Sequence, residues 1–319
     1  MSLQMPFYVS FCLIFWTLTL CSTTICSPIS YSSVNYHQIS DVCDWEGSGS
    51  IELDSDRAVV PVYLRCSHGT IKWFYPKGGL RVVLRYGTSN KNFRGCIRVA
   101  RNTSNSVRMY IEGNQQLHKL YSYDDQKHID LLRCFVSIDG KIAIFVESEP
   151  LLTHDLNDKQ IVKFSYDLQS VSSKQELISE DEECKPCDDN QMLSLYCTSD
   201  FIIEGTIHTL LHSNQLERSE LTVRAHKIIK DPIDNTYQTL GQNNSVSVDA
   251  VMSRYGIVKY FTLHRPLKCQ TKAGSGTEFL FMGRWLLGSP VISCAPKLSH
   301  WKHVKSRAQE SGTNQCQLF

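Results

Sequence analysis

The chain has 319 residues, of which 42% are hydrophobic and 20% are charged, and its formal net charge is +1. The composition is that of a globular protein, and the length leaves room for two domains of about 100–200 residues each. The near-zero net charge argues against a partner, such as nucleic acid, that is held by bulk positive charge.

The N-terminal region has the features of a secretory signal peptide. No Lys, Arg, Asp or Glu precedes Asp41, and residues 7–20 form a mainly apolar run. This run is shorter than the about 20 residues of a membrane-spanning helix, and it fits the apolar core of a signal peptide. Small residues offer cleavage after Ser22 or after Cys26; we favour Cys26, and expect residues 1–26 to be removed and the protein to be secreted. The alternative is an uncleaved anchor, because the usual positive charges at the start are missing.

The cysteine content predicts disulfides. Of the thirteen cysteines, Cys12, Cys21 and Cys26 leave with the signal peptide, so thirteen minus three leaves ten. An even number in the oxidising secretory pathway predicts that all are bridged. The first four allow 3 pairings and the last six allow 15. The ten are Cys43, Cys66, Cys96, Cys134, Cys184, Cys187, Cys197, Cys269, Cys294 and Cys316.

Short β-rich segments follow one another through the first half of the chain, and none has a sustained helical period. Asp139-Gly140, between two such segments, is a strong signal for a two-residue hairpin turn. Strands at a spacing of roughly ten residues predict an antiparallel β-sandwich. We place this domain at residues 41–169.

Residues 170–183 differ in composition from what precedes them. They are polar and Ser-rich and end in an acidic run from Glu180 to Glu183. Such a segment has too few apolar side chains to build a core, which predicts a linker between domains. Acidic residues can also bind calcium, but no spaced ligand loop or glycine turn accompanies these, so we interpret them as solvated.

The second half, residues 184–316, again has β-rich segments, which predict a small barrel. The stretch from Ala295 to Gly312 is different, because apolar residues recur at helical spacing and glycine provides a stop. The apolar positions are Leu298, Trp301, Val304 and Ala308. We therefore expect a packed helix near the C-terminus.

Basic residues accompany this terminal helix: Lys297, Lys302, Lys305 and Arg307. They are either a solvated helix face or a weak contact for a glycosaminoglycan such as heparan sulfate. Binding of that kind is driven by counterion release and falls with salt.

No motif for catalysis or metal binding is recognisable. The chain lacks a G-x-S-x-G elbow and a phosphate-binding loop, and His208 and His212 in "HTLLH" lack the glutamate of a metalloprotease motif. We expect no catalytic residue, no bound metal and no cofactor. The Cys184-Lys-Pro-Cys187 box is a redox pair, half of a zinc site or a structural staple, and a secreted protein favours the staple.

Five further residues are candidates for modification or binding. Asn102 and Asn243 begin glycosylation sequons, which suit passage through the secretory pathway. Trp73, Phe74 and Tyr75 form an aromatic cluster that is either part of the core or a binding hot spot.

Several long segments resemble one family. "CDWEGSGS", "VYLRCSHGTIKWFYPKGGLRVVLR", "RCFVSIDGKIAIFVES", "CKPCDDNQMLSLYCTSDFIIEGTI", "FLFMGRWLLGSPVISCAPKL" and "AQESGTNQC" are similar to the meteorin and meteorin-like family. The resemblance runs from Cys43 to Cys316. It implies a mainly β protein with a CUB-like antiparallel β-sandwich, followed by a netrin-like (NTR, OB-type) β-barrel with packed helices.

The resemblance also implies the disulfide pairing. In the first domain the pairs are Cys43–Cys66 and Cys96–Cys134. In the second they are Cys184–Cys269, Cys187–Cys294 and Cys197–Cys316. The two cysteines of the Cys184-Lys-Pro-Cys187 box would then bond to different distant segments and not to each other.

The function implied by the resemblance is that of a secreted ligand for a cell-surface receptor. Its activity would be neurotrophic, with roles in neurogenesis, axonogenesis and glial differentiation, or hormone-like. The alternative is an extracellular metalloprotease regulator, since CUB and NTR domains occur together in such proteins. NTR-type inhibitors chelate zinc through a free N-terminal cysteine, and the matching Cys184 lies in mid-chain, so inhibition would need a cut after Glu183. The calcium ligands of CUB domains do not align here, so no metal site is carried over.

Overall fold

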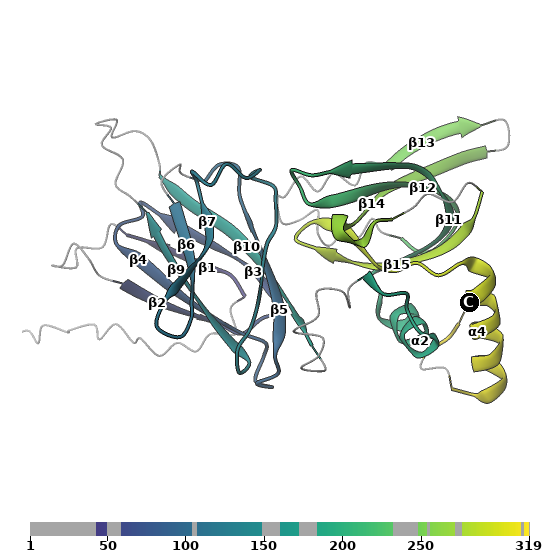
Figure 1. Ribbon diagram of the computed structural model, residues 1–319, viewed down its shortest axis with the longest axis horizontal. Helices are drawn as coiled ribbons and strands as arrows, with labels where there is room; N and C mark the ends of the chain where they lie inside the picture. The colour runs from purple at the N-terminus through teal and green to yellow at the C-terminus, as the bar shows by residue number, and fades with distance from the viewer. Residues whose placement is uncertain are drawn as a thin grey trace, which may run out of the picture. The chain divides into compact units, whose positions relative to one another are not determined.

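The computed structural model describes residues 43–49, 59–103, 107–148, 160–171, 184–231, 248–253, 256–271, 276–313 and 316–318. The predicted signal peptide and residues 172–183 of the predicted linker lie outside the described residues. The mainly β fold class is confirmed, with an N-terminal sandwich followed by a barrel and packed helices (Figure 1).

The sandwich consists of two five-stranded sheets. One has the order β1 (Trp45–Ser48), β3 (His68–Phe74), β10 (Ile161–Ser170), β5 (Phe93–Val99) and β8 (Arg133–Val136). The other has the order β2 (Val59–Leu64), β4 (Gly79–Arg85), β9 (Lys141–Ser148), β6 (Val107–Glu112) and β7 (Leu117–Ser122).

Most of these strands pair antiparallel, as expected, but in each sheet one edge strand pairs in parallel with its neighbour. β1 pairs with β3 in parallel, and β2 pairs with β4 in parallel. The chain alternates between the two sheets from β1 to β4, so each of these partners is reached after two crossings. Two reversals of direction bring the chain back parallel to where it began.

The sandwich core comes from the period-2 alternation of its strands. In β9, Ile142, Ile144 and Val146 are buried while the residues between them are not, because successive side chains point to opposite faces of a sheet. Trp73 of β3 is 1% exposed and packs in the same core. The Cys96–Cys134 disulfide joins residues that lie directly opposite each other on β5 and β8.

The barrel is a six-stranded sheet that closes on itself. Its order is β12 (Arg218–Lys230), β11 (Phe201–Ser213), β15 (Glu278–Leu286), β16 (Ser289–Cys294), β14 (Gly256–Pro266) and β13 (Val248–Ser253). A further pairing of β12 with β14 closes the ring, and β13 extends it on the outside. A short helix, η2 (Leu267–Cys269), follows β14.

Two helices, α2 (Asp189–Thr198) and α4 (Leu298–Ser311), lie side by side against the barrel (Figure 1). The rings of Tyr196 and Trp301 stack between them at 4.7 Å. The four apolar positions expected for the terminal helix are the buried ones of α4, and Gly312 ends it in the left-handed conformation. Within the described residues, no helix has both the length and the apolar character needed to cross a membrane.

Candidate functional site

The Cys184-Lys-Pro-Cys187 box lies at the mouth of the barrel and forms two separate bridges. Cys184 bonds to Cys269 of η2, and Cys187 bonds to Cys294 of β16. These are the partners that the resemblance implies. Since both sulfurs are bonded to distant residues, the box is neither a redox pair nor half of a zinc site.

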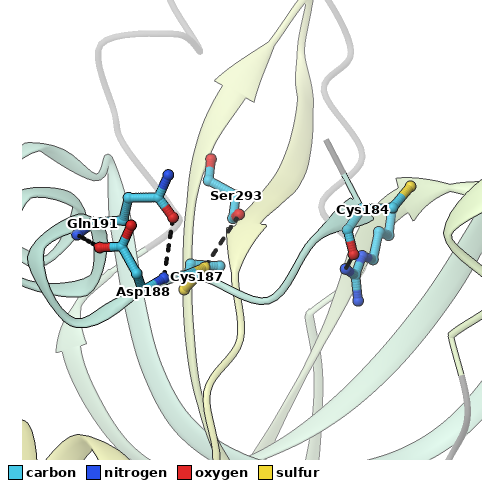
Figure 2. The surroundings of a disulfide bond; sticks show 7 residues. Cys184, Cys187, Asp188, Gln191 and Ser293 are labelled. Atoms are coloured by element: carbon cyan, nitrogen blue, oxygen red, sulfur yellow. Dashed lines mark hydrogen bonds between the residues drawn. A yellow bond between two sulfur atoms is a disulfide. The ribbon is translucent and has the colours of Figure 1, made fainter. Parts of the chain in front are cut away.

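The segment after the box is fixed by a capping box. The Asp188 side chain accepts a hydrogen bond from the Gln191 backbone at 2.8 Å, and the Gln191 side chain accepts one from the Asp188 backbone at 3.1 Å (Figure 2). These bonds satisfy two amides that the first helical turn would otherwise leave unpaired. The Asp-x-x-Gln spacing is a known helix-start signal, so α2 was open to prediction from sequence but was not predicted.

Three disulfides tie this region to the barrel. The bridges of Cys184 and Cys187 close loops with sequence separations of 85 and 107, and Cys197–Cys316 joins the end of α2 to the chain end with a separation of 119. Bridges of this kind stabilise by about 2–5 kcal/mol each. The three bridges therefore stabilise the mouth of the barrel and α2 against unfolding.

A cavity of about 490 Å³ opens at this mouth, between the Cys184–Cys187 segment, five barrel strands and the start of α4. Its apolar walls come from strands β11, β12, β15 and β16 and reach the barrel core. The residues are Ile207, Leu221, Phe279, Phe281 and Ile292. Leu221 and Phe281 are each 1% exposed, so the cavity ends on side chains that also fill the core.

Basic side chains surround the opening: Lys185, Arg265, Lys297 and His300. Arg265 lies 3.5 Å from the carbonyl oxygen of Cys184, to which it donates a hydrogen bond. His300 lies 3.2 Å from the carboxylate of Asp189. No Asp or Glu is among the described residues that line the cavity.

The basic residues of the terminal helix do not form one surface. Lys302 and Arg307 are exposed and lie about 140° apart around α4, at 3.6 residues per turn. Arg307 forms an ion pair with Asp189 of α2. Lys297 occupies the N-cap position of α4 without a side-chain capping bond and lines the cavity, and Lys305 is half-buried. Of the four candidates, Lys297 therefore lines the cavity and Arg307 is ion-paired. Lys302 and Lys305 are neighbours on α4, one helical turn apart.

The sequon of Asn102 lies in a turn of the sandwich. Asn102 is exposed, whereas Thr103 is buried and donates its hydroxyl to the Lys163 carbonyl oxygen at 2.7 Å. Thr103 also accepts from the Lys163 amide at 3.2 Å. Thr103, the middle residue of the Asn102-Thr103-Ser104 sequon, therefore has a structural role, and Ser104 lies outside the described residues. Asn243 lies outside the described residues.

The histidines of "HTLLH" lie on strand β11. The His208 ring contacts that of Tyr260 at 5.1 Å, and His212 shares a hydrogen bond of 2.9 Å with Ser219. In the part of the chain that the structure describes, no three His, Cys, Asp or Glu side chains are grouped to hold a metal ion.

The aromatic cluster of the sandwich divides between core and surface. Trp73 is a core residue, which contradicts a role for it in an exposed hot spot. Tyr75 is 50% exposed.

Reasoning from sequence missed the cavity altogether, because its lining comes from segments far apart in the chain.

A β-sandwich joined to a helix-flanked β-barrel, with disulfides that each stay within one of these two parts, defines a class of disulfide-rich, mainly β proteins. Within that class, two family models match this chain. The "Meteorin-like protein N-terminal domain" matches residues 45–178, and the "Meteorin, C-terminal domain" matches residues 186–308. The chain belongs to the meteorin family.

Relatives match along most of the chain. A meteorin-like protein of Danio rerio is 32% identical over 282 residues, covering 88% of this chain and 91% of the relative. A meteorin of Rattus norvegicus is 29% identical over 306 residues, covering 92% and 96%. Among solved structures, the CUB1-EGF-CUB2 domains of rat MASP-1 cover 40% of this chain and 49% of that chain with 8% identity and a TM-score of 0.26, too low to say more about the fold.

Proposed function

We propose that this protein is a secreted signalling factor that acts by binding a cell-surface receptor. The observation that carries the proposal is the match to the meteorin family over both domains, in a chain held by five disulfides. Disulfides of this density persist in oxidising compartments, which is where a secreted ligand folds and works.

The proposed activity is neurotrophic, promoting differentiation of glia or growth of axons, or hormone-like on other tissues. Such a factor needs a rigid, protease-resistant scaffold more than a catalytic centre. The three bridges around α2 and the two in the sandwich stabilise such a scaffold against unfolding, because they restrict the unfolded chain.

The test is binding of the purified, disulfide-bonded protein to intact cells, followed by cross-linking and capture of the receptor. Cultured glia and neurons are the first targets, and phosphorylation of signalling proteins is the readout. We expect saturable binding that excess unlabelled protein displaces. The matched control is the same protein after reduction and alkylation, which should neither bind nor signal.

Binding that does not saturate, or that survives reduction, would contradict the proposal. The same preparation should be incubated with a panel of extracellular metalloproteases. Inhibition or enhancement by the intact chain, without an effect on cells, would favour a protease regulator instead. The bonded, mid-chain position of Cys184 offers no free N-terminal amine for chelating zinc, so we expect no inhibition.

A further inference from the structure

The walls of the barrel-mouth cavity have a composition that favours an apolar occupant. Ile207 of β11 and Phe279 of β15 are half-buried at the opening, and Leu221 and Phe281 form deeper walls. Covering apolar surface is favourable by about 25 cal/mol per Å². A volume of about 490 Å³ is within the range of about 300–1,000 Å³ that small-molecule sites occupy.

The opening has the opposite character, because it is basic. Lys185, Arg265 and Lys297 lie around it, and none of its described lining residues is Asp or Glu. The whole chain has a formal net charge of only +1, so this concentration of positive charge is local. Cationic side chains beside a low-dielectric wall attract an anionic group more strongly than they would in open solvent.

A hydroxyl group provides an additional polar contact. Thr271 lines the cavity, and its Oγ1 atom is buried without a hydrogen-bond partner among the described residues. A buried hydroxyl that lacks a partner costs free energy, which a ligand oxygen within reach would recover. A carboxylate oxygen accepts such a bond from a threonine hydroxyl.

The cavity is also held in shape before any ligand arrives. The Cys184–Cys269 and Cys187–Cys294 disulfides fix the segment that carries Lys185 to two parts of the wall. A preformed site loses little conformational entropy when a ligand binds. The contacts of even a small ligand can then outweigh the free-energy cost of binding.

We propose that this cavity binds a small amphiphile with one apolar chain and an anionic head group, such as a fatty acid. The chain lies along the walls formed by Ile207, Phe279 and Phe281. The carboxylate lies at the opening, near Lys297 and Arg265 and within reach of the Thr271 hydroxyl. This site goes beyond receptor binding, and its test is independent of any receptor.

The test is displacement of a fluorescent fatty acid, dansylated undecanoate, from the purified full-length secreted protein. Four competitors separate the contribution of the apolar chain from that of the anionic head group. They are decanoate, decanol, decyltrimethylammonium and acetate. We expect decanoate to displace the probe at the lowest concentration, by about threefold or more relative to decanol, the difference that one exposed charge pair provides. Acetate, which lacks the chain, should not displace it.

Two pairs of variants locate the site. Lys297→Glu at the opening should weaken decanoate by about threefold or more and leave decanol unchanged. Lys302→Glu makes the same charge change on α4 outside the cavity and should change neither. Ile207→Gln should weaken both competitors by about fourfold or more, the worth of one buried methylene group. Leu211→Gln on the same strand, at a residue that is 63% exposed, is the control for folding.

The proposal fails if decanoate does not displace the probe up to its solubility limit, which would leave a protein segment as the occupant of the cavity. It also fails if decyltrimethylammonium competes as well as decanoate, or if Lys302→Glu weakens binding as much as Lys297→Glu. A loss of binding in Leu211→Gln equal to that in Ile207→Gln would likewise place the ligand elsewhere.

Discussion

The hydroxyl of Tyr166 on β10 donates a hydrogen bond to the carbonyl oxygen of Cys43, 2.9 Å away, across 123 residues of sequence. The same corner contains Gly69 of β3, where a Cβ atom would lie 1.8 Å from that carbonyl oxygen. A glycine is therefore required for β3 to pass Cys43 this closely. The hydrogen bond and the Cys43–Cys66 disulfide together fix the N-terminal edge of the sandwich.

Replacing Tyr166 with Phe tests this corner. The change removes the donor and leaves the Cys43 carbonyl group without it, which we expect to lower the free energy of unfolding by about 1–3 kcal/mol. Denaturant unfolding monitored by fluorescence measures the difference. Tyr63→Phe, at a residue that is 60% exposed, is the matched control and should change stability by no more than about 0.5 kcal/mol. Equal stability of both variants would contradict the structural role of Tyr166.

The environment of Tyr166 also predicts that the stability of the protein depends on pH. Burial, with a smaller contribution from Asp44, raises the pKa of Tyr166 well above its usual range. The unfolded chain then loses this proton at lower pH than the folded one, so stability is complete below about pH 10 and falls as pH rises above it. Tyr166→Phe should reduce this alkaline loss. An identical decline in both proteins would show that other groups cause it.

The mature protein should begin near Ser27 and contain no free thiol. The reason is the even number of cysteines after residue 26, all paired in the structure. N-terminal sequencing of the secreted protein, with thiol titration under denaturing, non-reducing conditions, measures both. One reactive thiol in a chain that begins after Ser22 would place cleavage at the earlier site. A thiol elsewhere would contradict the pairing.

Limited proteolysis should separate the two domains without reduction. No described disulfide joins a residue before position 170 to one after 183. A cut in the polar segment between Ser170 and Glu183 should therefore release two fragments, seen by non-reducing electrophoresis and mass spectrometry. Fragments that stay together under denaturing conditions until a reductant is added would reveal a bridge across the linker.

Glycosylation at Asn102 can be tested apart from folding. Asn102→Gln removes the acceptor at an exposed position, so the secreted protein should lose the mass of one glycan and keep its stability. Thr103→Ser keeps both the sequon and a hydroxyl that can bond to Lys163, and is the matched control. Thr103→Ala keeps the Asn102-x-Ser104 sequon, so it should keep the glycan and lose about 1 kcal/mol or more of stability, since it leaves the Lys163 backbone unpaired. An unchanged mass in Asn102→Gln would show that the site is not used.

Heparin binding should depend on Lys302 and Lys305, two neighbouring residues of α4. Lys302→Gln with Lys305→Gln should lower the salt concentration at which the protein elutes from a heparin column, because fewer counterions are released. Arg307→Gln is the comparison and should have a smaller effect, since Asp189 already pairs with Arg307. Elution of the parent protein at or below physiological salt would leave these residues as a solvated helix face.

Local patterns in the sequence were enough to predict the class of structure and several elements. The alternation of β9 and the helical spacing of Leu298, Trp301, Val304 and Ala308 reflect which side chains must leave water, and this is a local property. The start of α2 was also marked locally, by Asp188 and Gln191, although it was not predicted. Pairing of the cysteines was different, because arithmetic left many connectivities open and only the family resemblance selected one.

Only the tertiary structure decided the parallel edges of the sandwich, the closure of the barrel by β12 and β14, and the cavity at its mouth. The cavity brings Lys185, Ile207 and Arg265 together from segments that have no periodic relation in the sequence. Hydrophobic periodicity specifies which face of a strand is buried, but it contains no information on which distant strand it faces. Those neighbours are set by chain topology and by disulfides between distant residues, so the sequence by itself determined the elements and the fold determined the site.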